Sequence, residues 1–310
     1  MQSTEEKRNK FKNIFIRCSI LLLCVVSLAL YFGKYLGLLD WNDVFVSAGL
    51  RAEMDEDLSV CFLSVGTADA IYIHQDETDV LIDAGTKKSF TNIDTFLKRY
   101  DCKGFDAVFV THPDYDHIGG MSQILDNYET ENLYMYNYSA DFLSDAFDYN
   151  TFENSIKENN INKVFVSSKE NENKIIIGDL CFEVISPESE LSDINETSLV
   201  LKMTYGKNSF LFTGDIGEEA ENEIITKYPN LKCDVLKVAH HGSKYSSTQN
   251  FLNVVSPKIS VISSGDDNMY LPDFNTQARL AEISDVYITS RDGNVLVRSD
   301  GQIIEIQTKV

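Results

Sequence analysis

The chain has 310 residues, of which 27 are Lys or Arg and 48 are Asp or Glu, so its formal net charge at pH 7 is -21. Hydrophobic residues make up 43% and charged residues 24%, which is a globular composition and excludes a disordered or fibrous protein. The acidic excess also excludes electrostatic binding of nucleic acid or of an anionic membrane over a broad surface, because both need clustered positive charge.

An apolar segment near the N-terminus predicts a transmembrane helix. Residues 14–33 carry one charged side chain, Arg17, and are long enough for roughly 30 Å of helix, the thickness of a bilayer core. The basic residues from Lys7 to Arg17 predict that this end stays in the cytoplasm and that the rest is exported. Two alternatives stay open: a signal peptide cleaved near Ser27–Ala29, which also exports the chain, and a buried helix of a soluble domain.

The segment divides the chain into three expected parts. Residues 1–40 form a basic cytoplasmic flank and the membrane anchor, 41–57 form a linker, and 58–310 form one folded domain. Beyond residue 40 the chain carries 21 basic and 45 acidic side chains, a net charge of -24. We therefore expect a cell-membrane protein with one span and an acidic extracytoplasmic domain, or a secreted domain if the segment is cleaved.

Apolar runs of strand length alternate with helical stretches from residue 58 onward. The expected helices are 91–99, one or two within 140–160, 218–227, 247–254 and 276–283. The expected strands are 58–65, 70–73, 80–82, 107–110, 164–166, 174–177, 181–185, 198–204, 209–212, 235–238, 259–262, 286–288, 295–297 and 303–306. Because strands and helices alternate in both halves, the pattern predicts an α/β domain with two sheets and helices outside them.

The cysteines do not indicate a disulfide framework. Beyond the N-terminal segment they are widely spaced and show no C-x-x-C pair: Cys61, Cys102, Cys181 and Cys233. We therefore expect buried free thiols rather than disulfides or a zinc site built on cysteine.

Four groups of polar residues each follow a predicted strand. The first is dense, with two His and two Asp within six residues: His112, Asp114, Asp116 and His117. The others are Asp83, Asp215 in a Gly-Asp pair, and the pair His240-His241. Ligands that follow buried strands converge at one edge of a sheet, and His with Asp is a metal-binding combination. The pattern therefore predicts a metal site.

These segments resemble the metallo-β-lactamase fold hydrolases, in particular the extracytoplasmic hydrolase domain of ComEC-type competence proteins. The matching segments are CFLSVGTADAIYI (61–73), VLIDAG (80–85), THPDYDHIGG (111–120), SLVLKMTYGKNSFLFTGDI (198–216) and VLKVAHHGSK (235–244). The resemblance implies a four-layer αββα sandwich with a two-metal site on one edge. Full-length ComEC-type proteins carry many membrane helices, whereas this chain has one candidate, so we expect a hydrolase and not a DNA channel.

The resemblance also implies roles for individual residues. His112 and Asp114 would bind one divalent ion, Asp116 and His117 the other with His240 as a further ligand, and Asp215 would bridge both. Asp83 would contact the ligand residues, not the ions, and would orient them. Asp116 and His241 are the expected catalytic residues, with Asp116 taking a proton, and Ser243 and Lys244 could contact a substrate anion. For His241, Ser243 and Lys244 a purely structural role stays open.

Three departures from the family pattern bear on the metal and the substrate. Many relatives have His in place of Asp114, and the usual histidine before the Gly-Asp pair is absent, where this chain offers Asn195 and Ser198. The first site is therefore rich in oxygen, which favours Mn²⁺ or Mg²⁺, while Zn²⁺ stays open for the second. The late Gly-His-Pro-His element is replaced by Met269–Asp273, which has no histidine.

The leading expectation is a membrane-anchored, extracytoplasmic metallohydrolase that uses a metal-activated water on phosphodiesters, with single-stranded DNA among the candidate substrates. An envelope esterase acting on a phosphocholine ester or a lactone is the enzymatic alternative. A degenerate binding or assembly module is the third, and the complete ligand set argues against it. No extended basic track is evident, although Lys237, Lys244 and Lys258 lie near the histidine pair in sequence. The sequence leaves the oligomeric state open.

Overall fold

The structure is a computed structural model that describes Ser19 and residues 57–138, 149–169, 173–187 and 193–310. The predicted span at 14–33 and most of the linker therefore lie outside the described residues, and no helix among the described residues is long and apolar enough to cross a bilayer. Contacts divide the chain into two units, and the fold below belongs to the larger, Met54–Lys98 with Cys102–Val310.

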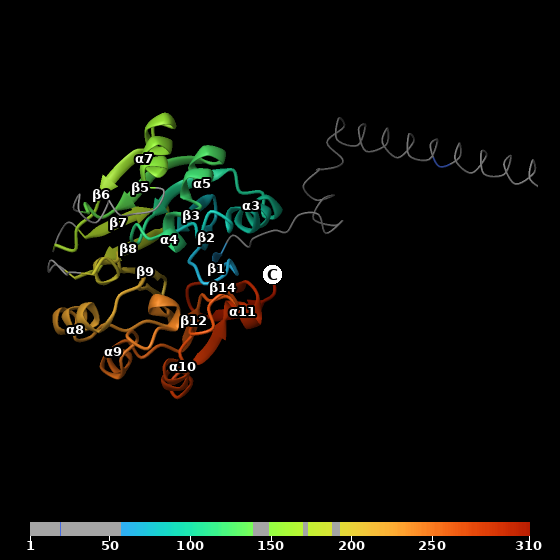
Figure 1. Cartoon of the computed structure of the whole chain (residues 1–310). Coiled ribbons are helices and arrows are strands. Elements are labelled where there is room, and N and C mark those ends of the chain that lie inside the picture. The colour runs from blue at the N-terminus through green and yellow to red at the C-terminus, as the bar shows by residue number, and fades with distance from the viewer. Residues whose placement is uncertain (1–18, 20–56, 139–148, 170–172, 188–192) are drawn as a thin grey trace, which may run out of the picture. The chain divides into compact units, whose positions relative to one another are not determined.

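Two β-sheets face each other across a shared apolar core (Figure 1). The eight-stranded sheet has the order β15 (Ile304–Thr308), β14 (Val295–Ser299), β1 (Leu58–Phe62), β2 (Ile71–Gln75), β3 (Thr78–Ile82), β4 (Gly104–Phe109), β5 (Glu129–Met135) and β6 (Asn162–Phe165). The seven-stranded sheet has the order β13 (Asp285–Ile288), β12 (Ile259–Ile262), β11 (Val235–Lys237), β10 (Asn208–Phe212), β9 (Leu201–Tyr205), β8 (Leu180–Val184) and β7 (Lys174–Ile177).

Aromatic side chains join the two sheets. The rings of Phe62 on β1 and Phe212 on β10 lie 6.3 Å apart, and those of Phe109 on β4 and Phe182 on β8 lie 4.9 Å apart. All four side chains are buried. Each sheet therefore presents one apolar face to the other, which removes the largest hydrophobic surfaces from water.

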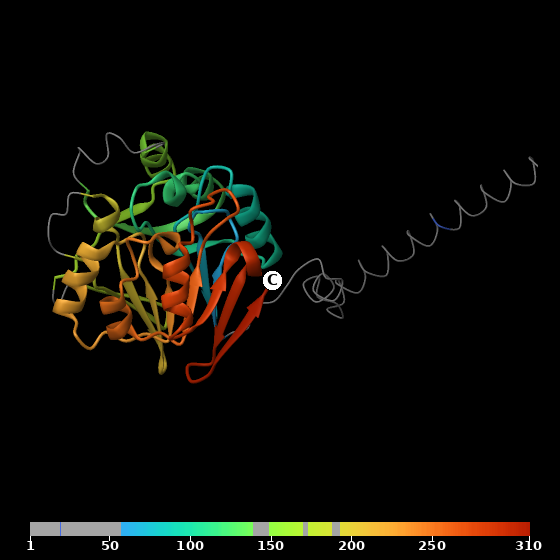
Figure 2. The ribbon, with the colours of Figure 1, turned by 60° about the horizontal axis from the view of Figure 1, so that its bottom comes forward.

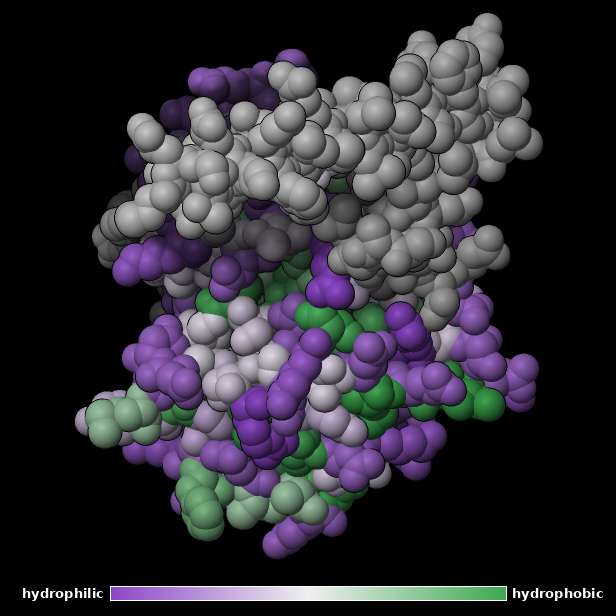
Figure 3. Space-filling view, turned by 90° about the vertical axis from the view of Figure 1, so that its right-hand side faces the viewer, coloured by the Kyte–Doolittle hydropathy of each residue, from purple (hydrophilic) through white to green (hydrophobic). Residues whose placement is uncertain are grey.

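Helices cover the outer faces of both sheets (Figures 1 and 2). Beside the eight-stranded sheet lie α3 (Phe90–Arg99), α5 (Met121–Asn127) and α7 (Tyr149–Glu158). Beside the seven-stranded sheet lie α8 (Glu218–Lys227), α9 (Gln249–Val255) and α10 (Phe274–Ala281), whose Ile224, Phe251 and Leu280 enter one apolar cluster with strand residues. The predicted α/β fold with two sheets is confirmed. The face in Figure 3 is hydrophilic over most of its described surface, with apolar residues interspersed.

Parallel strands occupy the part of each sheet that carries the polar segments. β3, β4, β5 and β6 run parallel to one another, and so do β10, β11, β12 and β13. Asp83 follows β3, the His112–His117 segment follows β4, Asp215 follows β10 and the histidine pair follows β11. Carboxyl ends of parallel strands meet at one edge of a sheet, so the topology gathers these residues.

Local features differ from the sequence predictions in a few places. Strand β5 and helix α5 were not predicted, and the strand expected over 58–65 ends at Phe62. Helix α10 begins at Phe274 and not at Thr276, because the Asp273 side chain accepts hydrogen bonds from Asn275 N and Thr276 N. Of the helices expected within 140–160 the structure shows α7, while 139–148 lie outside the described residues. The four described cysteines are free, and Cys61, Cys102 and Cys233 are buried as predicted, whereas Cys181 is half-buried.

Candidate metal centre

Asp83 holds the loop that follows β4. Its Oδ1 accepts a hydrogen bond from Thr111 N at 2.9 Å, and its Oδ2 accepts one from Thr111 Oγ1 at 2.6 Å. The same Oδ2 lies 2.8 Å from Nδ1 of His117. Both Asp83 and His117 are fully buried. The carboxylate therefore fixes the imidazole so that its Nε2 points away from Asp83, as an orienting carboxylate does for a metal-binding histidine.

The glycine pair after His117 lets two backbone segments meet. Gly120 N donates to Gly85 O at 3.0 Å, and Ala84 N donates to His117 O at 2.8 Å. A Cβ on Gly120 would lie 2.3 Å from Ala84 O, closer than any carbon can approach. The Ile-Gly-Gly sequence is therefore needed to dock the short helix α4 (Tyr115–Ile118) against the residues that follow Asp83.

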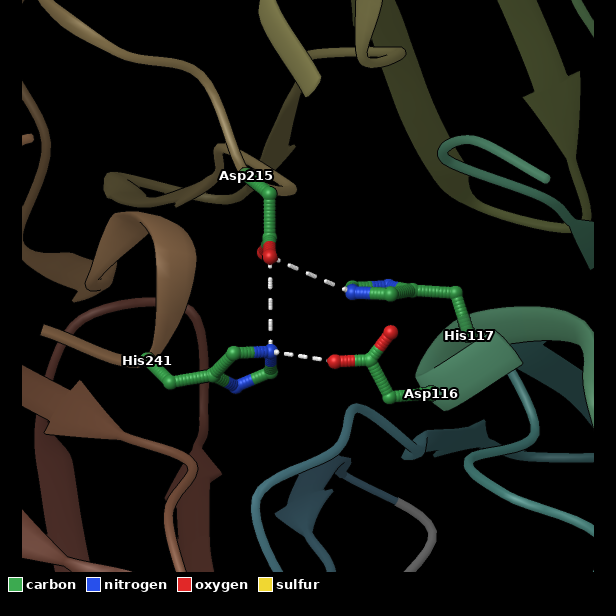
Figure 4. A group of neighbouring side chains, drawn as sticks. All are labelled: Asp116, His117, Asp215 and His241. Carbon is green, nitrogen blue, oxygen red and sulfur yellow. Dashed lines mark ion pairs between the residues drawn. The ribbon is translucent and has the colours of Figure 1, made fainter. Parts of the chain in front are cut away.

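Four side chains from both sheets converge on one point (Figure 4). Oδ2 of Asp215 lies 3.4 Å from Nε2 of His117 and 3.3 Å from Nε2 of His241. Nε2 of His241 also lies 3.3 Å from Oδ2 of Asp116. One donor atom from each residue lies within 4.8 Å of all the others. We call Asp116, His117, Asp215 and His241 the ligand cluster.

His112 and Asp114 lie beside the ligand cluster. The ring of His112 is 4.0 Å from that of His117, and its Nε2 is 3.8 Å from Oδ2 of Asp114. Ser198 lies behind His112: its Oγ is 3.4 Å from Nδ1 of His112 and accepts a hydrogen bond from Asp215 N at 3.1 Å. Ser198 thus connects this histidine to the aspartate of the Gly-Asp pair.

The two adjacent histidines point in different directions. Both lie in a 3-10 turn, η2 (Ala239–Gly242), with left-handed backbone, at φ 49° for His240 and 52° for His241. Their ring planes differ by 84°. His241 is buried, and its Nδ1 donates to Ser263 O at 2.9 Å, whereas the side chain of His240 is 33% exposed with its Nε2 4.0 Å from Asp215 Oδ2. Left-handed residues with large side chains are strained and concentrate at functional sites.

The residues present fit divalent cations. The buried Nε2 atoms of His112, His117 and His241 and the buried Oδ1 of Asp215 have no hydrogen-bond partner among the described residues. Buried polar atoms are almost always satisfied, so several convergent exceptions indicate a missing partner of opposite character. Imidazole nitrogen and carboxylate oxygen together are a donor set for Zn²⁺ or Mn²⁺.

The charges in the cluster stabilise one another in the metal-free protein. Burial lowers the pKa of His241, but Asp215 and Asp116 outweigh it and raise that pKa to about 10. Burial raises the pKa of Asp215, but His241 and His117 hold it well below its usual range. Protons on the histidines therefore neutralise the carboxylates, and a bound cation would displace them.

Two buried charged residues next to the ligand cluster were not predicted as site residues. Lys237, on β11, forms an ion pair with Asp69, and both side chains are at most 2% exposed. Asp69 lies 3.9 Å from Nδ1 of His117 and 3.9 Å from Nδ1 of His241. A charged residue inside an apolar strand is rarely buried unless it is paired, and Lys237 between Leu236 and Val238 was the available signal.

The expected substrate contacts lie outside the ligand cluster. Ser243 is buried, and its backbone oxygen accepts from Thr276 Oγ1 at 3.0 Å. Lys244 is exposed, with its ammonium 4.8 Å from the centre of the Tyr245 ring. Lys258 forms an ion pair with Asp234 at 2.7 Å.

The fold and the donor set together define an α/β protein with a candidate metal centre at one edge of its two sheets. Residues 63–266, about two thirds of the chain, match the family described as the metallo-β-lactamase superfamily. The chain belongs to this superfamily. The family resemblance inferred from the sequence is thereby confirmed.

Curated relatives include competence proteins. The chain is 31% identical over 247 residues to ComE operon protein 3 of Bacillus subtilis, covering 73% of this chain and 30% of that protein. It is 28% identical over 257 residues to competence protein ComA of Neisseria gonorrhoeae, covering 81% of this chain and 34% of that protein. The chain thus spans about a third of the length of these relatives.

Solved structures share the fold at low sequence identity. The metallo-β-lactamase fold protein YhfI of Bacillus subtilis superposes with a TM-score of 0.51 at 10% identity, covering 76% of this chain and 98% of that one. A metal-dependent hydrolase of the β-lactamase superfamily superposes with a TM-score of 0.51 at 13% identity, covering 78% of this chain and 100% of that one.

Proposed function

We propose that this protein is a metal-dependent phosphodiesterase. The observation that carries the proposal is the convergence on the ligand cluster of buried imidazole nitrogens and a carboxylate oxygen that make no hydrogen bond among the described residues. A cluster that served only stability would have satisfied these atoms with hydrogen bonds. This argues for catalysis over the degenerate binding module.

In the proposal, two divalent cations, Mn²⁺ or Zn²⁺ with Mg²⁺ as a further candidate, would occupy the centre. His112 and Asp114 would hold one, Asp116, His117 and His241 would hold the other, and Asp215 would contribute to both. Bound cations of this kind supply an activated water and polarise the phosphoryl oxygen of the substrate. The assignment replaces His240 by His241 as the ligand from the histidine turn, because His241 is buried and lies 0.7 Å closer to Asp215 Oδ2 than His240 does, at 3.3 Å against 4.0 Å.

Three polar residues around the centre then take distinct roles. Asp116 is one-third exposed and is thereby placed between the cluster and solvent, where its carboxylate can accept a proton from the attacking water. His240, also one-third exposed, faces the substrate side and can donate to a substrate oxygen. Asp83 keeps the His117 ring in one orientation throughout.

Positive charge at this edge is local. Lys237 is buried against Asp69, and the exposed Lys258 is paired with Asp234, so Lys244 is the exposed one of these three lysines that forms no ion pair among the described residues. An anionic substrate therefore gains attraction at the metal centre and little beyond it, which favours a small phosphodiester or a short single-stranded DNA end over long duplex DNA.

The proposal includes the location. Residues 14–33 would span the cell membrane once and leave the hydrolase domain outside, or would be removed as a signal peptide. Its support is the apolar length of the segment and the basic residues before it. Digestion of intact cells by an added protease tests this, because an extracytoplasmic domain is degraded while a cytoplasmic control protein survives.

Hydrolysis of bis-p-nitrophenyl phosphate by the purified full-length chain with Mn²⁺ tests the activity. We expect release of p-nitrophenol that EDTA abolishes and that His117→Asn lacks. His74→Asn is the matched control, since His74 also has a carboxylate, Asp79, 2.8 Å from its Nδ1 but lies outside the ligand cluster. Equal rates for wild type and His117→Asn, or no bound metal by elemental analysis, would contradict the proposal.

A substrate screen separates the proposal from its enzymatic alternative. The same protein is given single-stranded DNA, a phosphocholine ester polymer and a lactone. Cleavage of DNA supports the phosphodiesterase, whereas turnover of the lactone alone would identify an envelope lactonase of the same fold.

A further inference from the structure

A buried ion pair connects the two sheets directly behind the ligand cluster. Asp69 lies in the loop between β1 and β2 of the eight-stranded sheet, and Lys237 ends β11 of the seven-stranded sheet. Neither residue belongs to the ligand set proposed above. A buried ion pair is a weak source of stability, because desolvation offsets its attraction, so its position calls for another explanation.

Lys237 contacts the residues that place Asp215. Its ammonium donates to Gly214 O at 3.4 Å and lies 3.9 Å from Asp215 Oδ1. Its backbone oxygen accepts from Thr213 Oγ1 at 2.7 Å. One residue therefore contacts the three successive positions of the Thr-Gly-Asp sequence, and the other carboxylate oxygen, Oδ2, is the one directed at the histidines.

Asp69 ties the same ammonium to the other half of the centre. Its backbone N donates to Asp116 O at 3.1 Å, and its backbone oxygen accepts from Gly85 N at 2.7 Å. Its carboxylate also faces Nδ1 of both His117 and His241 at 3.9 Å. Asp69 therefore connects the end of the strand before Asp215 to the short helix α4, which carries Asp116 and His117.

The ammonium of Lys237 also neutralises a second acidic cluster beside the ligand cluster. Asp69, Asp83 and His117 offer donor atoms within 4.8 Å of one another, a spacing suited to a cation. Asp69 already binds the ammonium of Lys237, which supplies the positive charge there.

We propose that Asp69 and Lys237 are a positioning pair that holds the Asp215 carboxylate in the orientation in which it would bind metal. The inference rests on the proposed metal centre and adds two residues that act through Asp215 without binding metal. For the affinity of the centre for cations, this inference predicts the opposite of what the charge of Lys237 alone would predict. A positive charge near a ligand carboxylate opposes cation binding, so charge alone predicts tighter binding when Lys237 is neutralised, whereas lost positioning predicts weaker binding.

Isothermal titration of the metal-free full-length chain with Mn²⁺ distinguishes the two. We expect Lys237→Met to weaken Mn²⁺ binding by about 10-fold or more, the range found for groups that orient metal ligands. Lys258→Met is the matched control, because Lys258 also pairs with an aspartate but lies apart from the cluster, and its affinity should equal that of wild type. Unchanged or tighter binding in Lys237→Met would overturn the inference while leaving the proposed hydrolase intact.

A double variant covers the case in which Lys237→Met does not fold, since that change leaves the Asp69 charge buried without its partner. Asp69→Asn combined with Lys237→Met removes both charges at similar volume. We expect this variant to fold, with a circular dichroism spectrum like that of wild type, and still to bind Mn²⁺ about 10-fold or more weakly. Wild-type affinity in the folded double variant would show a structural pair and overturn the inference. A wild-type chain that bound no Mn²⁺ would overturn both the metal centre and the inference.

Discussion

Asp83 and His117 form a fully buried pair, with Oδ2 of the aspartate 2.8 Å from Nδ1 of the histidine. Because the carboxylate accepts the Nδ1 proton, it is Nε2 of His117 that faces the ligand cluster, where a bound cation would displace its proton. The pair thus sets both the orientation and the tautomer of a proposed metal ligand.

Removing the charge of Asp83 tests this arrangement. We expect Asp83→Asn to weaken Mn²⁺ binding by about 10- to 100-fold, because an amide can present either a donor or an acceptor to Nδ1 and no longer selects one tautomer. Isothermal titration of the metal-free chain measures it. Asp79→Asn is the control, since Asp79 lies 2.8 Å from Nδ1 of His74 in a pair outside the cluster; equal losses in the two variants would refute a specific role for Asp83.

The two adjacent histidines should differ sharply on substitution. Asparagine is the right replacement for both, because it tolerates the left-handed backbone of this turn. We expect His241→Asn to lose Mn²⁺ binding and phosphodiesterase activity together, since it removes a buried donor of the cluster. His240→Asn should keep metal binding and lower kcat. Titration and steady-state kinetics on both variants check this, and the reverse pattern would return the ligand role to His240.

Glu221 predicts a pH dependence of stability unrelated to the metal. This buried carboxylate accepts backbone hydrogen bonds from Ser247 and Thr248, and burial raises its pKa from 4.5 to about 7. The folded state therefore holds its proton more tightly than the unfolded state, so the free energy of unfolding falls as pH rises from 4.5 to 7 and then levels. The difference is roughly 3 kcal/mol for this group.

Urea unfolding in EDTA at pH 5 and pH 8 measures the effect. Glu221→Gln should lose less stability than wild type between these two pH values. Glu219→Gln, exposed on the same helix, should behave as wild type does. An identical pH slope in Glu221→Gln and wild type would show that Glu221 has an ordinary pKa.

Gly120→Ala should loosen the junction behind the ligand cluster. The added Cβ would lie 2.3 Å from Ala84 O, so either α4 or the residues after Asp83 must shift. We expect the free energy of unfolding to fall by about 1–3 kcal/mol, the usual cost of overpacking. Chemical denaturation of the metal-free protein measures it; a stability equal to that of wild type would mean that the two segments can separate without cost.

Much of the fold and most of the site residues could be predicted from the sequence. Strands with long apolar runs, such as β1, β10 and β12, were found because their residues are buried on both faces. β5 was missed because its first four residues alternate between exposed and half-buried positions and include Glu129 and Glu131, so it has no apolar run at its start. Its pairing with β4 and β6 decides its conformation, and that pairing is tertiary.

The arrangement within the site was less predictable. Spacing identified His240 and His241 as candidates, but only the left-handed turn determines which ring enters the cluster. Asp69 and Lys237 lie far apart in sequence, and although Lys237 stands out inside an apolar strand, nothing in the sequence connects it to Asp69. Their significance follows from the packing of one sheet on the other, which no local pattern reports.

The ligand cluster draws its members from loops on both sheets, and this has a consequence for refolding kinetics. Asp116 and His117 lie in α4, which follows a strand of the eight-stranded sheet, whereas Asp215 and His241 follow strands of the seven-stranded sheet. Neither sheet alone provides the full donor set, so divalent cations would bind with full affinity only after the two sheets have packed together. In the proposed metal centre, a contact made that late would leave the rate of refolding almost unchanged, and bound cations would instead slow the unfolding of the folded domain.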